Sequence, residues 1–116
     1  MSLKSLQKDE QTVIGAMLDS ILKRDLLISV FDIEGEGDVR SSKDRKRIED
    51  EIGITSLTKL HVHEQREDGN YFAGAVWFVH GNGAEVVSNM TVSPLMDAIW
   101  EEVLPVIDAT YDQENL

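Results

Sequence analysis

Two stretches of the chain carry apolar residues at helical spacing. Over residues 5–24 apolar side chains recur every three or four positions, which predicts an amphipathic helix. A second long helix is expected to begin at Pro94, because Ser93 can cap it and proline is tolerated at the first helical position. Pro105 lies inside this second run, and we expect it to kink the helix.

The segments between these helices predict about five strands. Residues 26–33 are β-branched, aromatic and almost continuously apolar, which is typical of a buried strand. An acidic turn with two glycines follows, and Val39-Arg40 then predicts a short second strand. Residues 57–66 alternate, and the hairpin signals Asp68-Gly69 and Asn82-Gly83 lead into strands over residues 71–80 and 84–91. The last three strands are therefore predicted to form an antiparallel meander.

A short helix is predicted between the second and third strands, over residues 43–52. Ser41 and Ser42 can cap its beginning, and Gly53 is placed to end it. The element order becomes α-β-β-α-β-β-β-α. This order predicts a single α+β domain over residues 1–116, with an antiparallel sheet of about five strands and two long helices packed on one face.

Two-residue loops in both hairpins would determine which side chains share a face of the sheet. Such loops would pair His61 with Val76 and His80 with Glu85. The face expected to receive the two long helices then carries Leu60, Val62, Ala73, Ala75, Trp77, Val79, Val86, Ser88 and Met90.

The opposite face of the predicted sheet has an apolar centre formed by Phe72, Val76, Phe78 and Val87. A sheet covered on one side alternates cleanly between apolar and polar residues, and this pattern does not. The short polar helix around Ile48 would be a poor cover for these side chains. We therefore expect homodimerisation or a protein partner at this face. The alternative is that a long helix of the same chain wraps around and covers it.

Charge is distributed unevenly along the chain. Twenty-two acids against eleven bases give a net charge of −11. Every base lies at or before Arg66, and residues 67–116 contain nine acids and no base. Such a field disfavours direct binding to nucleic acids or to anionic membranes and favours a basic protein partner. Alternatives are a role in solubility alone, or an acidic mimic of nucleic acid. The acids expected to face a partner are Glu101, Glu102, Asp108 and Asp112.

The composition also limits the cellular location and the kinds of site. The chain contains no cysteine, which excludes disulfides and zinc sites built on sulfur. The first eleven residues include four charged side chains, so an apolar signal-peptide core is not expected there. The longest stretch without a charged residue, residues 69–84, is too short to span a bilayer. We therefore predict a cytoplasmic protein.

Histidines and a basic cluster are the candidates for ligand chemistry. His61 and His63 point to the same side of their strand, but His80 would lie too far along the neighbouring strand to share one ion. No metal site is therefore predicted. Ser42, Lys43 and Arg45 could bind an anion at the start of the short helix. Ion pairs such as Arg45–Glu49 within that helix, or docking onto the acidic half, are the preferred interpretations.

No motif for nucleophilic catalysis or for a cofactor is present. The leading hypothesis is a non-enzymatic, acidic protein-binding module, chaperone-like or regulatory and homodimeric. One alternative is an enzyme, or a small-ligand or metal-binding protein, that uses His61, His63 and His80 with a nearby carboxylate. The other alternative is the nucleic-acid mimic described above.

Overall fold

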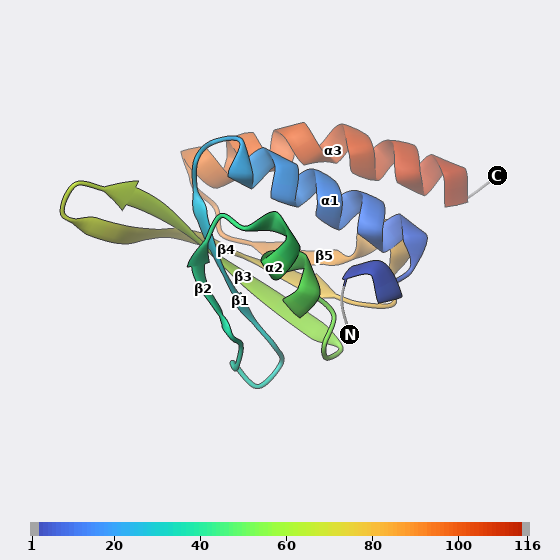
Figure 1. The fold of residues 1–116 in the computed structure, drawn as a ribbon. Coiled ribbons are helices and arrows are strands. Elements are labelled where there is room, and N and C mark those ends of the chain that lie inside the picture. Colours follow the sequence, from blue (N-terminus) through green and yellow to red (C-terminus); the bar gives the residue numbers. More distant parts are fainter. Residues whose placement is uncertain (1–2, 115–116) are drawn as a thin grey trace.

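A computed structural model describes residues 3–114 and contains a five-stranded sheet with helices on one face (Figure 1). The strands lie in the order β2-β1-β3-β4-β5, and every neighbouring pair is antiparallel. The predicted α+β class and the order of the elements are confirmed. The main elements are α1 (Lys8–Leu22), β1 (Leu27–Phe31), β2 (Val39–Ser42), α2 (Arg45–Glu51), β3 (Leu57–Arg66), β4 (Gly69–Val79), β5 (Val87–Met90) and α3 (Pro94–Glu114).

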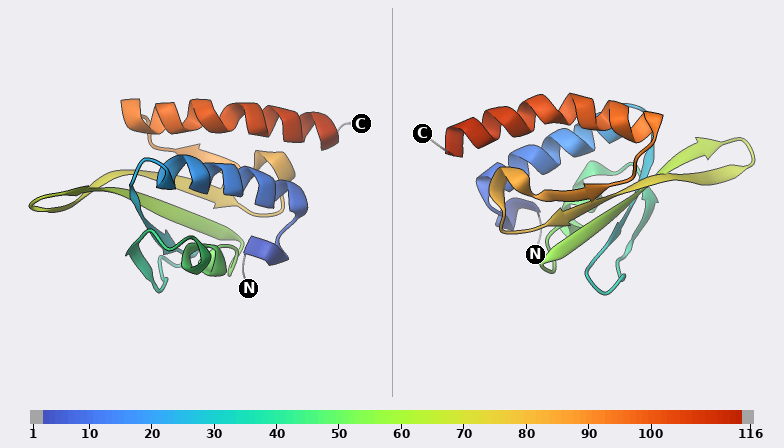
Figure 2. Two further views of the ribbon diagram at one scale, coloured as in Figure 1. Left: turned by 45° about the horizontal axis from the view of Figure 1, so that its top comes forward. Right: turned by 180° about the vertical axis from the view of Figure 1, so that it is seen from behind.

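The helices share one side of the sheet. α1 and α3 pack against each other along their length, as both views of Figure 2 show. α2 lies over β1 and β2, and its residue Ile48 belongs to the same buried core as Val13 of α1 and Val103 of α3. α3 approaches the sheet closely at Gly74, where a Cβ atom would lie 2.7 Å from Cγ of Met96. Within residues 3–114 all three α-helices lie on this side, and we call the other side of the sheet the open face.

The residues that cap the helices agree with the prediction for α3 but not for α2. Ser93 caps α3, because its Oγ accepts a hydrogen bond from the Met96 N–H at 3.2 Å. α2 is capped by Asp44, whose carboxylate accepts from the Arg47 N–H, and not by the serines that precede it. α3 continues through Pro105 to its end. Among residues 3–114, no helix combines the length and the apolar character needed to cross a bilayer.

The hairpin between β3 and β4 turns one residue earlier than predicted. Arg66 pairs with Gly69, so the two-residue loop is Glu67-Asp68. Gly69 is the first residue of β4 and has a φ of +142°, which favours glycine. Each residue of β3 near the loop consequently pairs two positions earlier in β4 than predicted. A shift of two leaves the side chains of this outer part on their predicted sides.

A β-bulge at Ala73 then exchanges the two faces of β4. His63 pairs with Phe72 whereas Val62 pairs with Gly74, so Ala73 has no partner in β3. An extra residue on one strand moves all later side chains of that strand to the opposite face. In the remainder of β4, the side chains that were predicted for the uncovered side therefore face the helices.

Val76 and Phe78 consequently lie in the core of the protein. Both are fully buried under the helices of their own chain, so the prediction that they form a contact surface is wrong. Val87 pairs with Phe78, lies on the same covered side and is half-buried. Ala75 and Trp77, which were predicted to lie under the helices, are on the open face instead.

The connection between β4 and β5 is longer than the predicted two-residue loop. It contains a 3-10 turn over Gly83–Glu85, and β5 begins only at Val87. The predicted pairing of His80 with Glu85 is therefore wrong. The meander of three antiparallel strands is nevertheless present, as expected.

The corrected register can be tested by comparing two phenylalanines of β4. Phe78→Ala removes a fully buried ring and is expected to lower the free energy of unfolding by roughly 3–5 kcal/mol. Phe72→Ala, at a side chain that is 58% exposed, should lower it by less than about 1 kcal/mol. Urea denaturation of both variants measures the difference. Equal losses of stability would contradict the register.

Candidate interaction surface

The open face is formed by alternate residues of the paired strands. The register assigns to it Leu27, Ser29, Phe31, Leu57, Lys59, His61, His63, Phe72, Ala75, Trp77, Val79 and Asn89. None of these twelve residues is acidic, although the chain contains twenty-two acids. The open face thus has a composition quite unlike the rest of this acidic chain.

Aromatic rings and cations meet at the centre of the open face. The His61 ring lies between Phe31 and Phe72, with ring centroids 4.6 Å and 5.1 Å away. Two cations lie over the Phe31 ring, the Arg40 guanidinium at 4.5 Å and the Lys59 ammonium at 5.6 Å from its centroid. Contacts of this kind are attractive because the face of an aromatic ring carries partial negative charge.

The environment of the two histidines favours their uncharged forms. Partial burial lowers the pKa of His61, and the nearby Lys59, His63 and Arg40 lower it further. Partial burial also lowers the pKa of His63. Both shifts favour the uncharged imidazole, so the positive charge of the open face comes mainly from Arg40 and Lys59.

A hairpin arm, defined as residues 64–72, extends from one end of the sheet. Its strands pair only with each other, because the partners of β1 in β3 end at His63 and those of β5 in β4 begin at Val76. The arm protrudes from the body in Figure 1 and contributes to a molecule measuring 50 × 29 × 21 Å. The Arg66 guanidinium stacks on the Tyr71 ring at 4.5 Å, and the Tyr71 hydroxyl donates to Asp68 at 2.5 Å. Two-stranded hairpins are marginally stable alone in water.

Of the four predicted interface residues, Phe72 alone lies on the exposed part of the open face. It stands at the base of the arm, beside His61 and His63. Sequence reasoning missed Phe31 and Trp77, since it placed Trp77 under the helices and treated the strand of Phe31 as buried. The sequence of β1 does not alternate between apolar and polar residues in a way that separates its two faces, because Leu27, Ile28 and Ser29 are all buried.

The acids predicted to face a partner lie along α3. Glu101, Asp108 and Asp112 are exposed there. Glu102 is engaged within the chain, because it accepts hydrogen bonds from Lys23, Arg24 and Ser20 of the α1 region. These contacts, with that of Lys23 the largest, lower the pKa of Glu102 to about 2. Glu102 thus joins α3 to α1.

The predicted anion site is filled by groups of the chain itself. The Ser42 hydroxyl accepts from the backbone N–H of Asp44 at 3.0 Å, and Lys43 pairs with Asp25 at 2.5 Å. Arg45 pairs with Glu49 at 2.9 Å, as the preferred interpretation predicted, and with Asp19. α2 has only seven residues and offers no further sign of an anion ligand.

His80 does not join the other two histidines. His61 and His63 lie on the open face with ring centroids 6.2 Å apart, while His80 follows β4 and points into the protein. Among residues 3–114, no three His, Asp or Glu side chains converge as metal ligands. The predicted pairing of His61 with Val76 is also replaced, because His61 pairs with Ala75.

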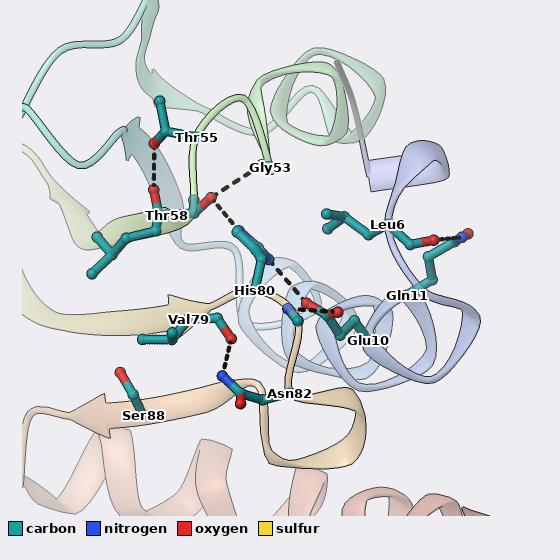
Figure 3. A network of polar contacts seen from close by, with 12 residues as sticks. Leu6, Glu10, Gln11, Gly53, Thr55, Thr58, Val79, His80, Asn82 and Ser88 are labelled. Carbon is teal, nitrogen blue, oxygen red and sulfur yellow. Dashed lines mark hydrogen bonds and ion pairs between the residues drawn. The ribbon is translucent and has the colours of Figure 1, made fainter.

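His80 instead belongs to a buried polar network (Figure 3). Its Nδ1 lies 3.1 Å from the Glu10 carboxylate, and its Nε2 lies 2.7 Å from the Thr58 hydroxyl. The other Glu10 oxygen accepts from the Gly81 N–H at 3.0 Å, and Thr58 Oγ1 accepts from the Gly53 N–H at 3.1 Å. The network links α1, the beginning of β3 and the end of β4.

A carboxylate, an imidazole and a hydroxyl in this order resemble the arrangement that activates a hydroxyl nucleophile. Thr58 is only 1% exposed, however, and Thr58, His80 and Glu10 line none of the three pockets that lie between β5 and α3, beside the acidic turn and near Arg24. The Thr58 hydroxyl is therefore shielded from solvent in this structure. We assign the network a structural role, in which each buried polar group satisfies another.

Comparison of the chain with models of known protein families, with curated proteins and with solved structures found no match. The functional interpretation consequently depends on the surfaces described above.

The structural role of the network predicts a loss of stability in Thr58→Val. Valine matches threonine in shape but leaves the Gly53 N–H and the His80 nitrogen without their buried partner. We expect the free energy of unfolding to fall by roughly 1–3 kcal/mol. Thr12→Val, at an exposed threonine of α1, is the matched control and should change it by less than about 0.5 kcal/mol. Urea denaturation gives both free energies of unfolding. A Thr58→Val variant as stable as the original chain would contradict the structural role of the network.

The lowered pKa of Glu102 predicts that the stability of the folded chain depends on pH. A carboxyl group whose pKa falls on folding stabilises the folded state above its ordinary pKa, and this contribution disappears as the pH drops through the folded value. Glu102→Gln should therefore lower the melting temperature at neutral pH. Its difference from the unmodified chain should shrink between about pH 4.5 and about pH 2. Glu101→Gln, at the exposed neighbour, should show no such pH-dependent difference in thermal melts.

Proposed function

We propose that the protein is a cytoplasmic, non-enzymatic interaction module that forms a homodimer through its open face. The observation that carries this proposal is the absence of acids from a sheet face that also holds Phe31, Phe72 and Trp77. Rings at the centre of interfaces between proteins commonly supply much of the binding energy. A surface without acids is also the part of this chain that a second copy can approach with the least repulsion.

The hairpin arm gives the proposed dimer a self-complementary charge pattern. Its loop carries Glu67 and Asp68, while Arg40 and Lys59 lie toward the other end of the open face. A two-fold axis that crosses the strands near His61 would reverse the strands of the second copy. Each acidic loop would then lie near the cations of the other copy, as an interface between identical surfaces requires.

Dimerisation would also stabilise the arm. The base of the arm exposes the ring of Phe72, and neither strand of the arm has a third strand beside it. Contact with a second sheet would bury that ring and contribute the packing that an isolated hairpin lacks.

The proposal predicts that Phe72→Asp converts dimers to monomers. The substitution adds an acid to the acid-free surface at a residue whose exposure lets the monomer fold unchanged. Sedimentation velocity at micromolar concentration should show a dimer for the original chain and a monomer for the variant. Leu104→Asp, at an exposed residue of α3, is the control and should remain dimeric. A monomeric original chain, or dimers that survive Phe72→Asp, would contradict the proposal.

A charge exchange tests the orientation of the two copies. Lys59→Glu should weaken the dimer, and the added substitution Glu67→Lys should restore it, because each pair would meet again with opposite signs. Restoration in the double variant would support the two-fold arrangement described above. Further weakening in the double variant would contradict that arrangement.

A further inference from the structure

We propose that the free edge of β5 and the groove beside it bind an extended polypeptide segment in which a Lys or Arg is flanked by apolar residues. This site shares only Asn89 with the open face, and binding to it does not depend on dimerisation. The segment would pair with β5 as an additional strand, while one of its side chains enters the groove.

The groove lies between β5 and the first half of α3. Its volume is about 270 Å³, and the residues that line it include Met90, Met96 and Trp100. Asp97 also lines it and is exposed. The site therefore combines an apolar floor, an aromatic ring and a carboxylate within one small depression.

Backbone groups on the outer edge of β5 are available for pairing. The Thr91 N–H donates to the Ala75 carbonyl at 2.9 Å, so by alternation the peptide groups of Met90 and Val92 point away from β4. The Met90 N–H is bonded to the side chain of Asn89 at 2.8 Å, and this side chain can rotate away to release the donor. Val92 is an apolar residue with 86% exposure at the end of this edge. Figure 2 shows β5 as the outermost strand, below α3.

The opposite edge of the sheet is protected against such pairing. Within β2 the pairing to β1 is interrupted by a bulge, and Ser41 has a φ of +47°. Arg40 donates to the Gly37 carbonyl at 2.5 Å, and Arg47 donates to the Asp38 carbonyl at 3.2 Å. Charged side chains and bulges are common means of blocking an edge strand. β5 has a bulge near Ser88 but no charged side chain, which leaves Asn89–Val92 as its open part.

The negative charge around the groove favours the binding of a basic segment. Asp97 and Glu101 are separated by one helical turn, so they share a side of α3. Trp100, which lines the groove, can accept a cation over its ring. No Lys or Arg occurs after Arg66, so no base within residues 67–116 competes for these groups.

The site can be tested by NMR titration with a synthetic hexapeptide of alternating Val and Arg, capped at both ends. We expect saturable shifts of the backbone amides of residues 89–92 and of the Trp100 indole N–H. A matched peptide of alternating Val and Glu should produce none. Absence of saturation with the Val-Arg peptide, or equal binding of both peptides, would overturn the proposal.

Two substitutions separate backbone pairing from charge. Val92→Pro removes an outward N–H at an exposed position and should abolish the saturable shifts. Asp97→Asn should weaken binding two- to fivefold, the range expected for one exposed ion pair. Asp108→Asn, near the other end of α3, is the matched control and should leave it unchanged. Saturable binding that persists in Val92→Pro, or an affinity of Asp97→Asn equal to that of the original chain, would overturn the proposal.

Self-association is distinguished in the same experiment. If dilution of the protein alone shifts residues 89–92, a second copy occupies this edge and the proposal is overturned. Binding of the Val-Arg peptide to Phe72→Asp tests independence from the open face. Equal affinity in that variant supports a separate site, whatever the outcome for dimerisation.

Discussion

The pairing of β3 with β4 is the interaction on which most of the structure depends. It joins ten residues of β3 to β4, twice as many as the pairing of β3 with β1. The bulge at Ala73 interrupts this ladder at the point where the arm leaves the sheet. Through that one unpaired residue, Val76 and Phe78 enter the core while Trp77 turns to the open face. The composition of the core and that of the candidate surface are thus two consequences of one irregularity.

Polar contacts between residues far apart in the sequence join the helices and the sheet in addition to the apolar packing. Glu10 of α1 reaches His80 and Gly81 at the end of β4, seventy residues away in the sequence. At the other end of α1, Glu102 of α3 accepts hydrogen bonds from Ser20, Lys23 and Arg24. Each end of α1 is therefore tied by a carboxylate, either to the sheet or to the second long helix. The buried Glu10 carboxylate is stable only when its partners are present, and the partly exposed Glu102 adds ion pairs between α1 and α3, so both favour this arrangement of the elements.

Local patterns predicted the elements well and their relative placement less well. Helical periodicity and the Ser93-Pro94 start were sufficient for the long helices, and alternation identified β3 with its observed bounds. The faces of β4 were wrong because a bulge has no reliable signature in one sequence, and the small residues around Gly74 gave only a weak hint of it. Nor could local spacing predict the contact of Glu10 with His80, because it depends on where α1 crosses the sheet. The fold class could be derived from the sequence, whereas the composition of the open face required the register.

The distribution of charge relates the two proposed surfaces to each other. Two copies that meet through their open faces keep their α3 helices on opposite outer sides, where the acids of the two chains are far apart and screened by salt. Pairing of two β5 edges would instead bring two acidic α3 helices close together. The β5 edge is therefore poorly suited to a second copy and well suited to a basic segment. Its outward peptide groups lie in the plane of the sheet, whereas the side chains of the open face are perpendicular to it. The two surfaces share only Asn89, so occupation of one would leave most of the other accessible.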